Sequence, residues 1–484
     1  MNGGPGSDSL LGLFDELGPC RITENLTTTL NPWSFSNVSN LLFLSQPVGV
    51  GFSYQEEVVG SRSEGTGGIL REDQVPENST VPIGRYGILN ATSGEHTIDT
   101  TDAAAIAGWE VVQGFISGIE SLGGKAKKPK TFNLWAESYG GHWGPAFLDY
   151  FYEQNQGIEN GTVDGHPLEF GTLGLVNPFV DALIQDPWGP EFAVNNNFGI
   201  VALNESQYEY TQLAMNGPAG CGVQISECTK AAQAIKDGFV DGFITAVAAA
   251  DLHVNAVCSK AMNMCRDNVE LPYIFYSGHG IYDIRHPALD PTPPMHLPDF
   301  LNQGHIQQAI GVSLNYSATS KAEVFNEFQR TGDWVFPNSL RHVEKLLGYG
   351  VRVALVYGDA DYACNWHGGE ALSLAIKHEN AEGFAAAGYQ PLEYAGEVYG
   401  DVKEHGNLSF VRVFDAGHLV PYYQRKSCHQ VKAIQPSSNN LTSSSIIRAF
   451  QPHDPWPRVS GWFAADHGEL LDDWTGEFNA HAAF

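Results

Sequence analysis

Basic residues are scarce in this chain: 26 lysines and arginines stand against 55 aspartates and glutamates, a formal net charge of −29 at pH 7. This shortage argues against nucleic acid and anionic membranes as partners, because both attract positively charged surfaces. Apolar runs are short, and none reaches the roughly 18 residues of a membrane-spanning helix. The N-terminus shows no basic segment followed by an apolar one, so the sequence contains no recognisable secretory signal. The acidic balance suits a protein that works in an acidic or extracellular space.

Charged residues make up only 17% of the chain and hydrophobic residues 43%, which is typical of a globular protein and not of a disordered one. A chain of 484 residues can bury a large core. Its length allows either one large domain with insertions or two to three ordinary domains.

Acceptor patterns for N-linked glycans, Asn-x-Ser/Thr, occur nine times, which is more than we expect by chance. Accidental patterns in an Asn- and Ser-rich chain would explain some of them. The remainder indicate the secretory route, which conflicts with the missing signal unless the true start of the protein is absent from the sequence. The candidate positions are Asn25, Asn37, Asn78, Asn90, Asn160, Asn204, Asn315, Asn407 and Asn440.

The seven cysteines include two pairs with the same internal spacing. This mirror spacing fits a nested pair of disulfides, Cys221 with Cys265 and Cys228 with Cys258, although sequence alone does not fix the connectivity. Cys20 and Cys428 are candidates for a third bridge, which leaves Cys364 as the odd thiol. The alternative is a set of buried, reduced cysteines in a cytosolic protein.

Strand and helix patterns alternate along the chain. Residues 40–54 form an apolar run that predicts a buried strand, and residues 55–100 predict a long surface excursion without periodicity. A helix with one buried face is expected from Asp102 onward, and another from Pro145 onward. Further strands are expected at residues 132–135, 173–181 and 351–365. The alternation predicts a mostly parallel sheet covered by helices on both faces.

The stretch AESYGG places Ser138 in a sharp turn between a predicted strand and a predicted helix. A nucleophilic serine at the top of an α/β sheet requires this context. The pattern is weak by itself, because small residues around a serine are common and Ala136 occupies the position usually held by the first glycine. Its interpretation depends on partner residues.

Two partners follow in the chain order that the α/β-hydrolase arrangement requires, serine, then aspartate, then histidine. Asp361 lies in a turn after an apolar strand, and His418 follows Gly417 in the stretch VFDAGHLVPYY. A histidine takes the proton of the serine, and a carboxylate orients the histidine. The alternatives are a structural histidine and ordinary turn aspartates at positions 359 and 361.

The glycine-rich start, NGGPGS, gives this site a further component. An acyl-transfer site needs two N–H donors for the oxyanion, one from the residue after the nucleophile and one from an upstream loop. Tyr139 and Gly4 are the candidates, because a glycine lets the backbone approach a reacting atom.

Nine ordered motifs resemble those of the serine carboxypeptidases. They are NGGPGS, GLFDELGP, NPWSF, LFLSQPVGVGFSY, AESYGGHWGPAF, YDIRHP, FLNQGHIQQAIGV, VYGDADYACNWHGG and AGHLVPYYQ, and the similarity runs from Asn2 to about Gln424. The resemblance, which is nearest to secreted fungal-type members, implies an α/β-hydrolase that removes C-terminal residues from peptides and proteins at acidic pH. It also implies a secreted, vacuolar or lysosomal protein that is a monomer or a homodimer and needs no metal or organic cofactor.

The same resemblance implies roles for individual residues. Ser138, Asp361 and His418 match the catalytic triad, and Gly4 and Tyr139 match the oxyanion hole. The site for the terminal carboxylate of the substrate matches Asn2, Glu16 and Glu137, and Cys364 matches an unpaired cysteine near the substrate pocket. Two carboxyl groups beside a substrate carboxylate resist ionising together, so one stays protonated in acid and donates a hydrogen bond. The alternative for Glu16 and Glu137 is an exposed helix carboxylate and a mere neighbour of the turn.

The resemblance also predicts the domain plan. Residues 1–180 and 341–424 form the two parts of the hydrolase core, residues 181–340 form an inserted cap stapled by the disulfides, and residues 425–484 form a divergent tail. Ala136 and Ser45 depart from the family pattern: we expect the extra methyl group of Ala136 to be tolerated, and Ser45, where the family usually has aspartate, to cause only a local loss. Relatives carry strands before the glycine loop, so we expect the N-terminal strands of the sheet to be missing from this chain.

The sequence therefore predicts a serine carboxypeptidase. Two other functions stay open at this point. One is an acyltransferase on the same fold, because an alcohol can intercept the same acyl-enzyme in place of water. The other is a catalytically silent secreted glycoprotein, which the truncated start favours and the complete triad opposes.

Overall fold

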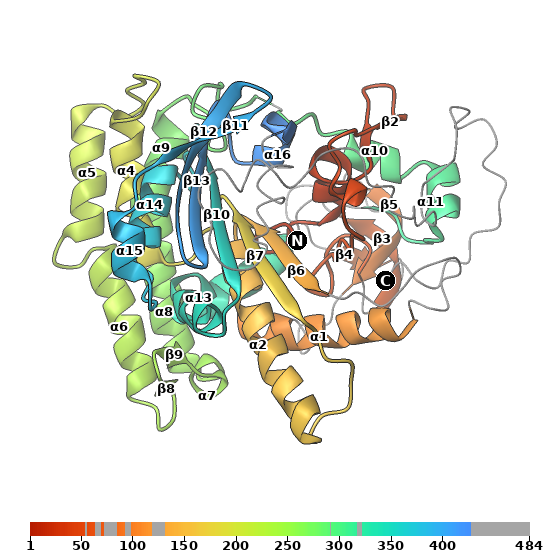
Figure 1. The fold of residues 1–484 in the computed structure, drawn as a ribbon, viewed down its shortest axis with the longest axis horizontal. Coiled ribbons are helices and arrows are strands. Elements are labelled where there is room, and N and C mark those ends of the chain that lie inside the picture. The colour runs from red at the N-terminus through yellow and green to blue at the C-terminus, as the bar shows by residue number, and fades with distance from the viewer. Residues whose placement is uncertain are drawn as a thin grey trace, which may run out of the picture.

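The computed structural model describes residues 1–53, 56–62, 69–71, 85–91, 98–118, 131–290, 292–316 and 322–426. Its centre is a six-stranded mixed sheet with the order β11-β12-β13-β10-β7-β6 (Figure 1). Neighbours from β6 to β13 are parallel, and β12 and β11 extend the sheet as antiparallel strands. The strands are β6 (Phe132–Glu137), β7 (Phe170–Val176), β10 (Arg352–Gly358), β11 (Gln390–Tyr394), β12 (Glu397–His405) and β13 (Leu408–Val413).

The central strands are buried on both faces, as expected for a parallel sheet between two layers. In β10, every residue after Arg352 is buried. Leu355 and Tyr357 belong to the main core cluster, whereas Val356 belongs to a second cluster with residues of β12 and β13. The predicted strands at 132–135, 173–181 and 351–365 are thus confirmed as β6, β7 and β10, although β7 and β10 end earlier than expected.

Long helices cover one face of the sheet. α1 (Thr101–Gly118) packs on α2 (Gly140–Asn160), and α13 (Asn338–Gly348) packs on α2 and β10. Trp109, Val112 and Ile116 form the buried stripe of α1, as the spacing predicts, whereas Ile106 is 50% exposed. α14 (Trp366–Ala375) follows β10 on the same core cluster.

The opposite face is covered by short segments. α16 (Val420–Tyr423) contributes Val420 and Tyr423 to the second apolar cluster. Phe35, in the short helix η2 (Phe35–Asn37), lies edge-on to Trp135 of β6, with ring centroids 5.6 Å apart. The predicted sheet covered on both faces is confirmed, with the N-terminal segment in place of a long helix on this side.

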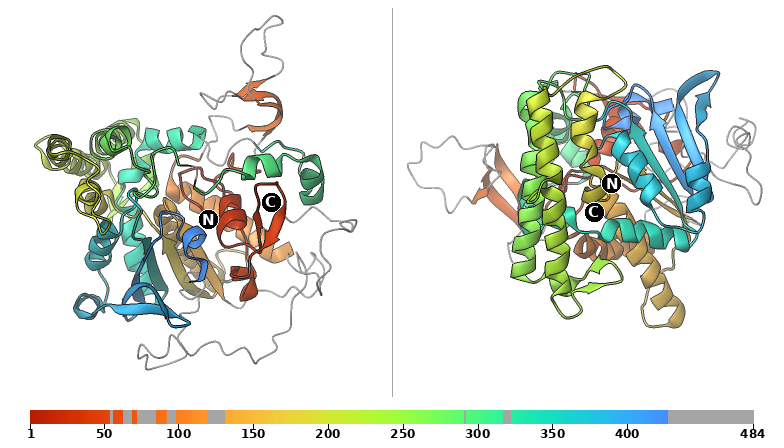
Figure 2. Two further views of the ribbon diagram at one scale, coloured as in Figure 1. Left: turned by 90° about the horizontal axis from the view of Figure 1, so that it is seen from above. Right: turned by 90° about the vertical axis from the view of Figure 1, so that its left-hand side faces the viewer.

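A helical insertion lies between β7 and β10. Figures 1 and 2 show its long helices α5, α6 and α8 as one layer beside the sheet. Two disulfides, Cys221–Cys265 and Cys228–Cys258, join α6 to the facing helix α8, so the predicted nested pairing is confirmed. The elements of the insertion are α3 (Ala182–Gln185), α4 (Trp188–Val194), α5 (Glu205–Asn216), α6 (Cys221–Gln233), β8 (Phe239–Val240), β9 (Phe243–Ile244), α7 (Ala246–Ala249), α8 (Leu252–Cys265), η4 (Arg266–Glu270), α9 (Leu271–Tyr276), α10 (Leu297–Leu301), α11 (Gly304–Ile310), α12 (Ala322–Thr331) and η5 (Asp333–Val335).

Of two expectations for the first hundred residues, one was wrong and the other was incomplete. The described part of 40–54 forms no strand, and two of its carbonyl oxygens accept from side-chain hydroxyls: Ser9 Oγ donates to Leu44 O at 2.6 Å, and Ser53 Oγ donates to Ser45 O at 2.6 Å. The excursion after it is not irregular throughout. Its described parts form a three-stranded antiparallel sheet of β3 (Glu56–Arg62), β4 (Ile69–Arg71) and β5 (Arg85–Ala91), in the order β4-β3-β5.

The remaining described elements are η1 (Gly12–Glu16), the antiparallel pair β1 (Cys20–Ile22) and β2 (Thr28–Leu30), and α15 (Ala381–Ala386). In the part of the chain that the structure describes, the helices are all too short or too polar to cross a membrane.

Candidate active site

Ser138 lies in a strained turn between β6 and α2. Its φ of 62° is in the left-handed region, which few side chains adopt. The turn is held from both sides, because Ser138 N donates to Val176 O at 3.0 Å and Ser138 O accepts from Phe179 N at 2.9 Å. A side chain at Gly141 would approach Phe179 O to 2.2 Å, so this position requires glycine. The helix begins at Gly140, earlier than the predicted start at Pro145.

Ala136 departs from the usual glycine of this turn, and its methyl group is accommodated. Ala136 is buried, and a side chain at Gly140 would come within 2.7 Å of its Cβ. The absence of a side chain at Gly140 therefore leaves the space that the alanine occupies. This contact supports the expectation that the substitution is tolerated.

His418 and Asp361 form a buried pair at the ends of β13 and β10. His418 Nδ1 lies 2.7 Å from Asp361 Oδ2, and Asp361 is fully buried. An ionised carboxylate at this position orients the imidazole with its proton on Nδ1, which leaves Nε2 free to act as a base. Within the described residues, Ser138 Oγ makes no hydrogen bond to His418. Tyr282 lies near both residues. Its ring centroid is 4.8 Å from that of His418, and it lines the same cavity as Ser138.

Asn177 also forms a hydrogen bond with Asp361, and it was not among the residues predicted from the sequence. Its Nδ2 donates to Asp361 Oδ2 at 2.7 Å, and its Oδ1 accepts from Gly358 N at 3.1 Å. Asn177 is buried directly after β7 with a φ of 40°. Asn177 fell inside the strand predicted at 173–181, whereas β7 ends at Val176, so its place at the strand end beside β10 was not recognised.

The glycine loop runs directly beside the serine turn. Met1 pairs with β6 in parallel fashion, since Met1 N donates to Trp135 O at 2.7 Å and Glu137 N donates to Met1 O at 3.0 Å. A side chain at Gly3 would lie 2.3 Å from Tyr139 N, so the loop approaches this amide as only glycine can.

The two predicted oxyanion donors are available. Gly4 has a φ of 108° and lines the cavity together with Ser138. Among the described residues, the backbone N–H groups of Gly4 and Tyr139 donate to no other group. The side chain of Tyr139 is anchored elsewhere: its hydroxyl donates to Asp333 Oδ2, and Asp333 also accepts from Thr101 N at 2.9 Å. Asp333 is a second residue that sequence patterns did not reveal.

Asn2, Glu16 and Glu137 come together in the buried interior next to the turn. Asn2 Nδ2 lies 3.2 Å from Glu16 Oε1 and 3.0 Å from Glu137 Oε1, and Asn2 Oδ1 accepts from Gly12 N at 3.1 Å. All three side chains are buried, so the reading of Glu16 as an exposed helix carboxylate is wrong. Glu16 comes from η1 and Glu137 from the end of β6, one residue before Ser138.

The two carboxyl groups of this cluster resist ionisation. Burial, the charge of Glu16 and the hydrogen bond between the two carboxyl groups raise the pKa of Glu137 well above its ordinary value. Burial also raises the pKa of Glu16, against the hydrogen bonds of Glu137 and Asn2, which lower it. The pair therefore holds a proton at pH values where exposed glutamates have lost theirs.

Cys364 lies at the same site as an unpaired, buried thiol. It lines the cavity with Ser138, and its backbone N donates to Asp361 Oδ2 at 3.2 Å. Burial raises the pKa of the Cys364 thiol well above its ordinary value, so it stays protonated. Cys20 forms no disulfide with a described residue, and Cys428 lies outside the described residues, so the pairing of these two stays a prediction.

Four of the candidate glycosylation positions are exposed, as attachment of a glycan requires: Asn25, Asn37, Asn160 and Asn204. Asn315 and Asn407 are half-buried. Asn78, Asn440 and the side chain of Asn90 lie outside the described residues.

Ser45, the other departure from the family pattern, donates its hydroxyl to the buried Asp8, so a serine here avoids placing a second carboxylate beside Asp8.

Comparison with known proteins agrees with this geometry. The family model for serine carboxypeptidases matches residues 1–434. The chain is 39% identical to carboxypeptidase S1 homolog B of Arthroderma otae over 445 residues, which cover 89% of this chain and 65% of that protein. It is 29% identical to carboxypeptidase S1 of Penicillium janthinellum, covering 88% of this chain and 84% of that protein. The chain thus spans slightly less than two thirds of the length of the Arthroderma otae relatives that it matches.

A solved structure supports the fold. The crystal structure of Kex1(Δ)p, a prohormone-processing carboxypeptidase from Saccharomyces cerevisiae, superposes with a TM-score of 0.59 at 19% identity, and the match covers 89% of this chain and 80% of that one. At this identity the likeness shows the fold alone, an α/β-hydrolase with a mixed sheet and flanking helices, as the sequence predicts. With nine-tenths of its length matched by the family model, the chain belongs to the serine carboxypeptidase family.

Proposed function

We propose that this protein is a serine-type carboxypeptidase that removes C-terminal residues from peptides and proteins at acidic pH. The observation that carries the proposal is the buried pair of Glu16 and Glu137, which Asn2 holds together and of which Glu137 directly precedes Ser138. A protonated carboxyl group and an amide next to the turn that carries a nucleophile are suited to bind the carboxylate at the end of a peptide.

The chemistry follows from the arrangement of Ser138, His418 and Asp361. Ser138 Oγ attacks the last peptide carbonyl while its proton passes to His418 Nε2, and Asp361 stabilises the imidazolium. The N–H groups of Gly4 and Tyr139 receive the negative charge that develops on the carbonyl oxygen. His418 then gives the proton to the leaving amino acid, and water, activated by the same histidine, hydrolyses the acyl-enzyme.

The pH range follows from Glu16 and Glu137. While the pair holds a proton, it donates a hydrogen bond to the substrate carboxylate. As the pH rises through the raised pKa values, the pair loses this proton and repels the substrate carboxylate. Binding of peptides with a free C-terminus therefore weakens with rising pH.

The cellular location of the protein and its division into domains are part of the same proposal. The exposed Asn-x-Ser/Thr positions and the two disulfides support the secretory pathway, with an extracellular or vacuolar destination. We assign residues 1–180 and 341–424 to the catalytic core and 181–340 to a cap, and the helical insertion between β7 and β10 supports this plan.

The test is release of the terminal amino acid from an N-blocked dipeptide at about pH 5 and about pH 8. The matched control substrate carries a C-terminal amide, which has no charge for the glutamates to repel. We expect release of the free-acid substrate to fall with pH much more than release from the amide, and Ser138→Ala to abolish both. A folded chain that releases nothing, and whose Ser138 does not react with an organophosphonate, would contradict the proposal.

A further inference from the structure

Residues 279–287 form a closed loop of the helical insertion, between α9 and α10. Gly280 N donates to His286 O at 2.8 Å, so the two ends of the loop are held together. We call residues 281–285, at the tip of this loop, the bridging segment. The motif YDIRHP lies in the loop, and the proposed catalytic steps give it no role.

The backbone of the bridging segment is hydrogen-bonded to the turn that carries Asp361. Ile281 O accepts from Tyr362 N at 3.2 Å, and Ile284 N donates to Ala360 O at 2.9 Å. The residues directly before and directly after Asp361 are therefore both fixed to the helical insertion.

The same segment is hydrogen-bonded to the loop that carries His418. His418 N donates to Tyr282 O at 2.8 Å, and the ring centroids of the two residues lie 4.8 Å apart. The two backbones approach closely, because a side chain at Gly417 would come within 2.5 Å of Tyr282 O. One short segment of the insertion thus contacts the loops of both His418 and Asp361.

An ion pair inside the bridging segment fixes its shape. Arg285 Nε and Nη2 donate to the two carboxylate oxygens of Asp283 at 2.9 and 2.7 Å, the forked arrangement that arginine forms with a carboxylate. Asp283 is buried, and the side chain of Arg285 is only 24% exposed, so solvent screens the pair weakly. Arg285 Nη2 also donates to Asp415 O at 3.3 Å, and Nη1 donates to Asp415 Oδ1 at 3.3 Å. Arg285 therefore connects the segment to the loop of His418 three residues before the histidine.

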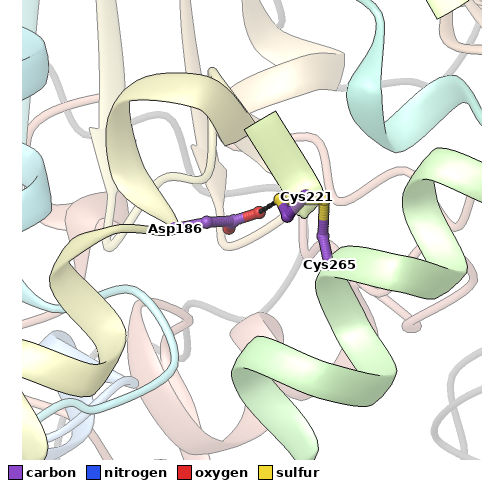
Figure 3. A group of neighbouring side chains, drawn as sticks. All are labelled: Asp186, Cys221 and Cys265. Carbon is purple, nitrogen blue, oxygen red and sulfur yellow. Dashed lines mark hydrogen bonds between the residues drawn. A yellow bond between two sulfur atoms is a disulfide. The ribbon is translucent and has the colours of Figure 1, made fainter. Parts of the chain in front are cut away.

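The helices that lead into the loop are cross-linked. α8 continues through η4 into α9, and the disulfide Cys221–Cys265 joins the last residue of α8 to α6. Figure 3 shows this disulfide with Asp186, near the start of the insertion, directed at it. Tyr273 of α9 stacks on Tyr362, with ring centroids 3.5 Å apart. This stacking connects the cross-linked helices to the residue that follows the aspartate of the proposed triad.

We propose that the bridging segment, held by the pair of Asp283 and Arg285, is a positioning element for His418. The inference rests on the proposed function, because it takes His418 as the base for Ser138. A small displacement of the imidazole lengthens the proton transfer between these two residues and slows the reaction. Neither Asp283 nor Arg285 takes part in the chemistry, and both act through the position of the loops.

The first experiment compares Arg285→Lys with the native chain. Lysine keeps a positive charge beside the buried Asp283, but it cannot form the forked pair and also reach Asp415. We expect kcat for an N-blocked dipeptide to fall roughly ten- to a hundred-fold. KM should change much less, because the groups that bind the terminal carboxylate lie on other elements.

Arg330→Lys is the matched control. Arg330 on α12 also donates to two acidic residues, to Glu327 through Nε and to Asp99 through Nη2, both at 2.8 Å. Arg330 lines no part of the cavity beside Ser138, so kcat of this variant should be unchanged. An unchanged kcat in Arg285→Lys would overturn the inference.

Two further variants separate positioning from a loss of folding. Arg285→Gln leaves the carboxylate of Asp283 buried without its arginine partner, so we expect a lower midpoint of thermal unfolding. The double variant Asp283→Asn with Arg285→Gln removes both charges. We expect it to recover most of the stability but not kcat. Recovery of kcat together with stability would show that the pair serves folding alone.

A measurement without substrate distinguishes failure of this inference from failure of the proposed function. Proton NMR detects the Nδ1 proton of His418 in its hydrogen bond to Asp361, whether or not the chain cleaves peptides. We expect Arg285→Lys to shift or broaden this resonance and Arg330→Lys to leave it unchanged. A folded chain that shows this difference but cleaves no peptide would contradict the proposed function and keep the positioning role. An unchanged resonance in a native chain that does cleave peptides would remove the positioning role alone.

Discussion

Asn177 and Asp361 face each other across the ends of two parallel strands, with Asn177 Nδ2 2.7 Å from Asp361 Oδ2. Asn177→Asp keeps the shape of the side chain and the acceptor for Gly358 N but replaces the donor to Asp361 with a second carboxylate. We expect kcat to fall roughly ten- to a hundred-fold with little change in KM, because the orientation of His418 suffers and substrate binding does not.

The same substitution has a pH signature. Two neighbouring carboxylates repel each other less when one is protonated, so part of the activity should return as the pH is lowered. A pH profile of kcat for both proteins checks this, and a loss that is constant with pH would indicate a purely structural defect.

Gly3→Ala tests the oxyanion hole. The added Cβ would lie 2.3 Å from Tyr139 N and 2.5 Å from Glu137 O, so the loop must shift and the donors lose their alignment. We expect kcat to fall by about 10²- to 10³-fold. Gly114→Ala on α1 is the matched control: no atom lies within 4 Å of its added Cβ, and activity should be unchanged. Steady-state kinetics of the two variants side by side are decisive.

Glu137→Gln should make substrate binding less dependent on pH. The pKa of Glu137 is raised by burial, by the charge of Glu16 and by their shared hydrogen bond, so in the native protein the proton of the pair is lost as the pH rises and KM for free-acid peptides increases. A glutamine cannot ionise and keeps an N–H donor. We expect KM of the variant to change less between about pH 5 and pH 8, and an unaltered pH dependence would refute the role of the pair.

His342 links three helices through charged hydrogen bonds. Its Nδ1 lies 2.6 Å from Asp149 Oδ2, and its Nε2 lies 3.2 Å from Asp102 Oδ1. Burial lowers the pKa of His342, but the hydrogen bonds to Asp102 and Asp149 outweigh it and raise the pKa to about 9.

The folded pKa of His342 lies above that of an unfolded histidine, about 6.5. The contribution of His342 to the free energy of unfolding is therefore present in full below about pH 6.5 and is lost as the pH rises through about 9, an effect on the order of 3 kcal/mol. Urea unfolding of His342→Gln should show a large deficit near pH 6 that shrinks near pH 10. A deficit of equal size at both values would contradict this role.

The two disulfides give a matched pair of variants. They are nested, with sequence separations of 44 and 30 residues, so while one is intact the other closes a ring of only about 16 residues, and the chain-entropy model assigns its loss about 3 kcal/mol. Replacing either pair by serine should lower the midpoint of thermal unfolding by a similar amount. Only the loss of Cys221–Cys265 should also change substrate preference, because Cys265 lines the cavity and neither Cys228 nor Cys258 does. Identical substrate preference in both variants would show that the Cys221–Cys265 disulfide does not shape the substrate cavity.

Prediction from sequence succeeded where the pattern was local and strong. The strand β10 is buried along nearly its whole length, so its apolar run could be recognised directly. The antiparallel strands β11 and β12, at one side of the sheet, are partly exposed and carry charged residues, which gives no such pattern, and the sequence analysis did not predict them. The apolar run at 40–54 shows the reverse error, since apolar character alone does not provide a partner strand.

The residues of the candidate site also fall into those that local sequence patterns predict and those that they do not. Ser138, Asp361 and His418 lie in short motifs at strand ends, and their chain order could be read directly. Asn177 and Asp333 act through contacts with residues far along the chain, so no local pattern marks them. Tyr282 begins the motif YDIRHP, but its contact with His418 depends on the fold and was not predicted. The roles of the motif residues in catalysis stay predictions that the experiments above address.

Glu137 and Ser138 are joined by one peptide bond at the end of β6. In the proposed function, Glu137 helps to bind the end of the peptide and Ser138 cleaves it, so the distance between these two groups is limited by covalent geometry. In the proposed enzyme, only the bond one residue from a free end comes within reach of the serine. Such an enzyme shortens its substrates stepwise and leaves interior bonds and cyclic peptides intact.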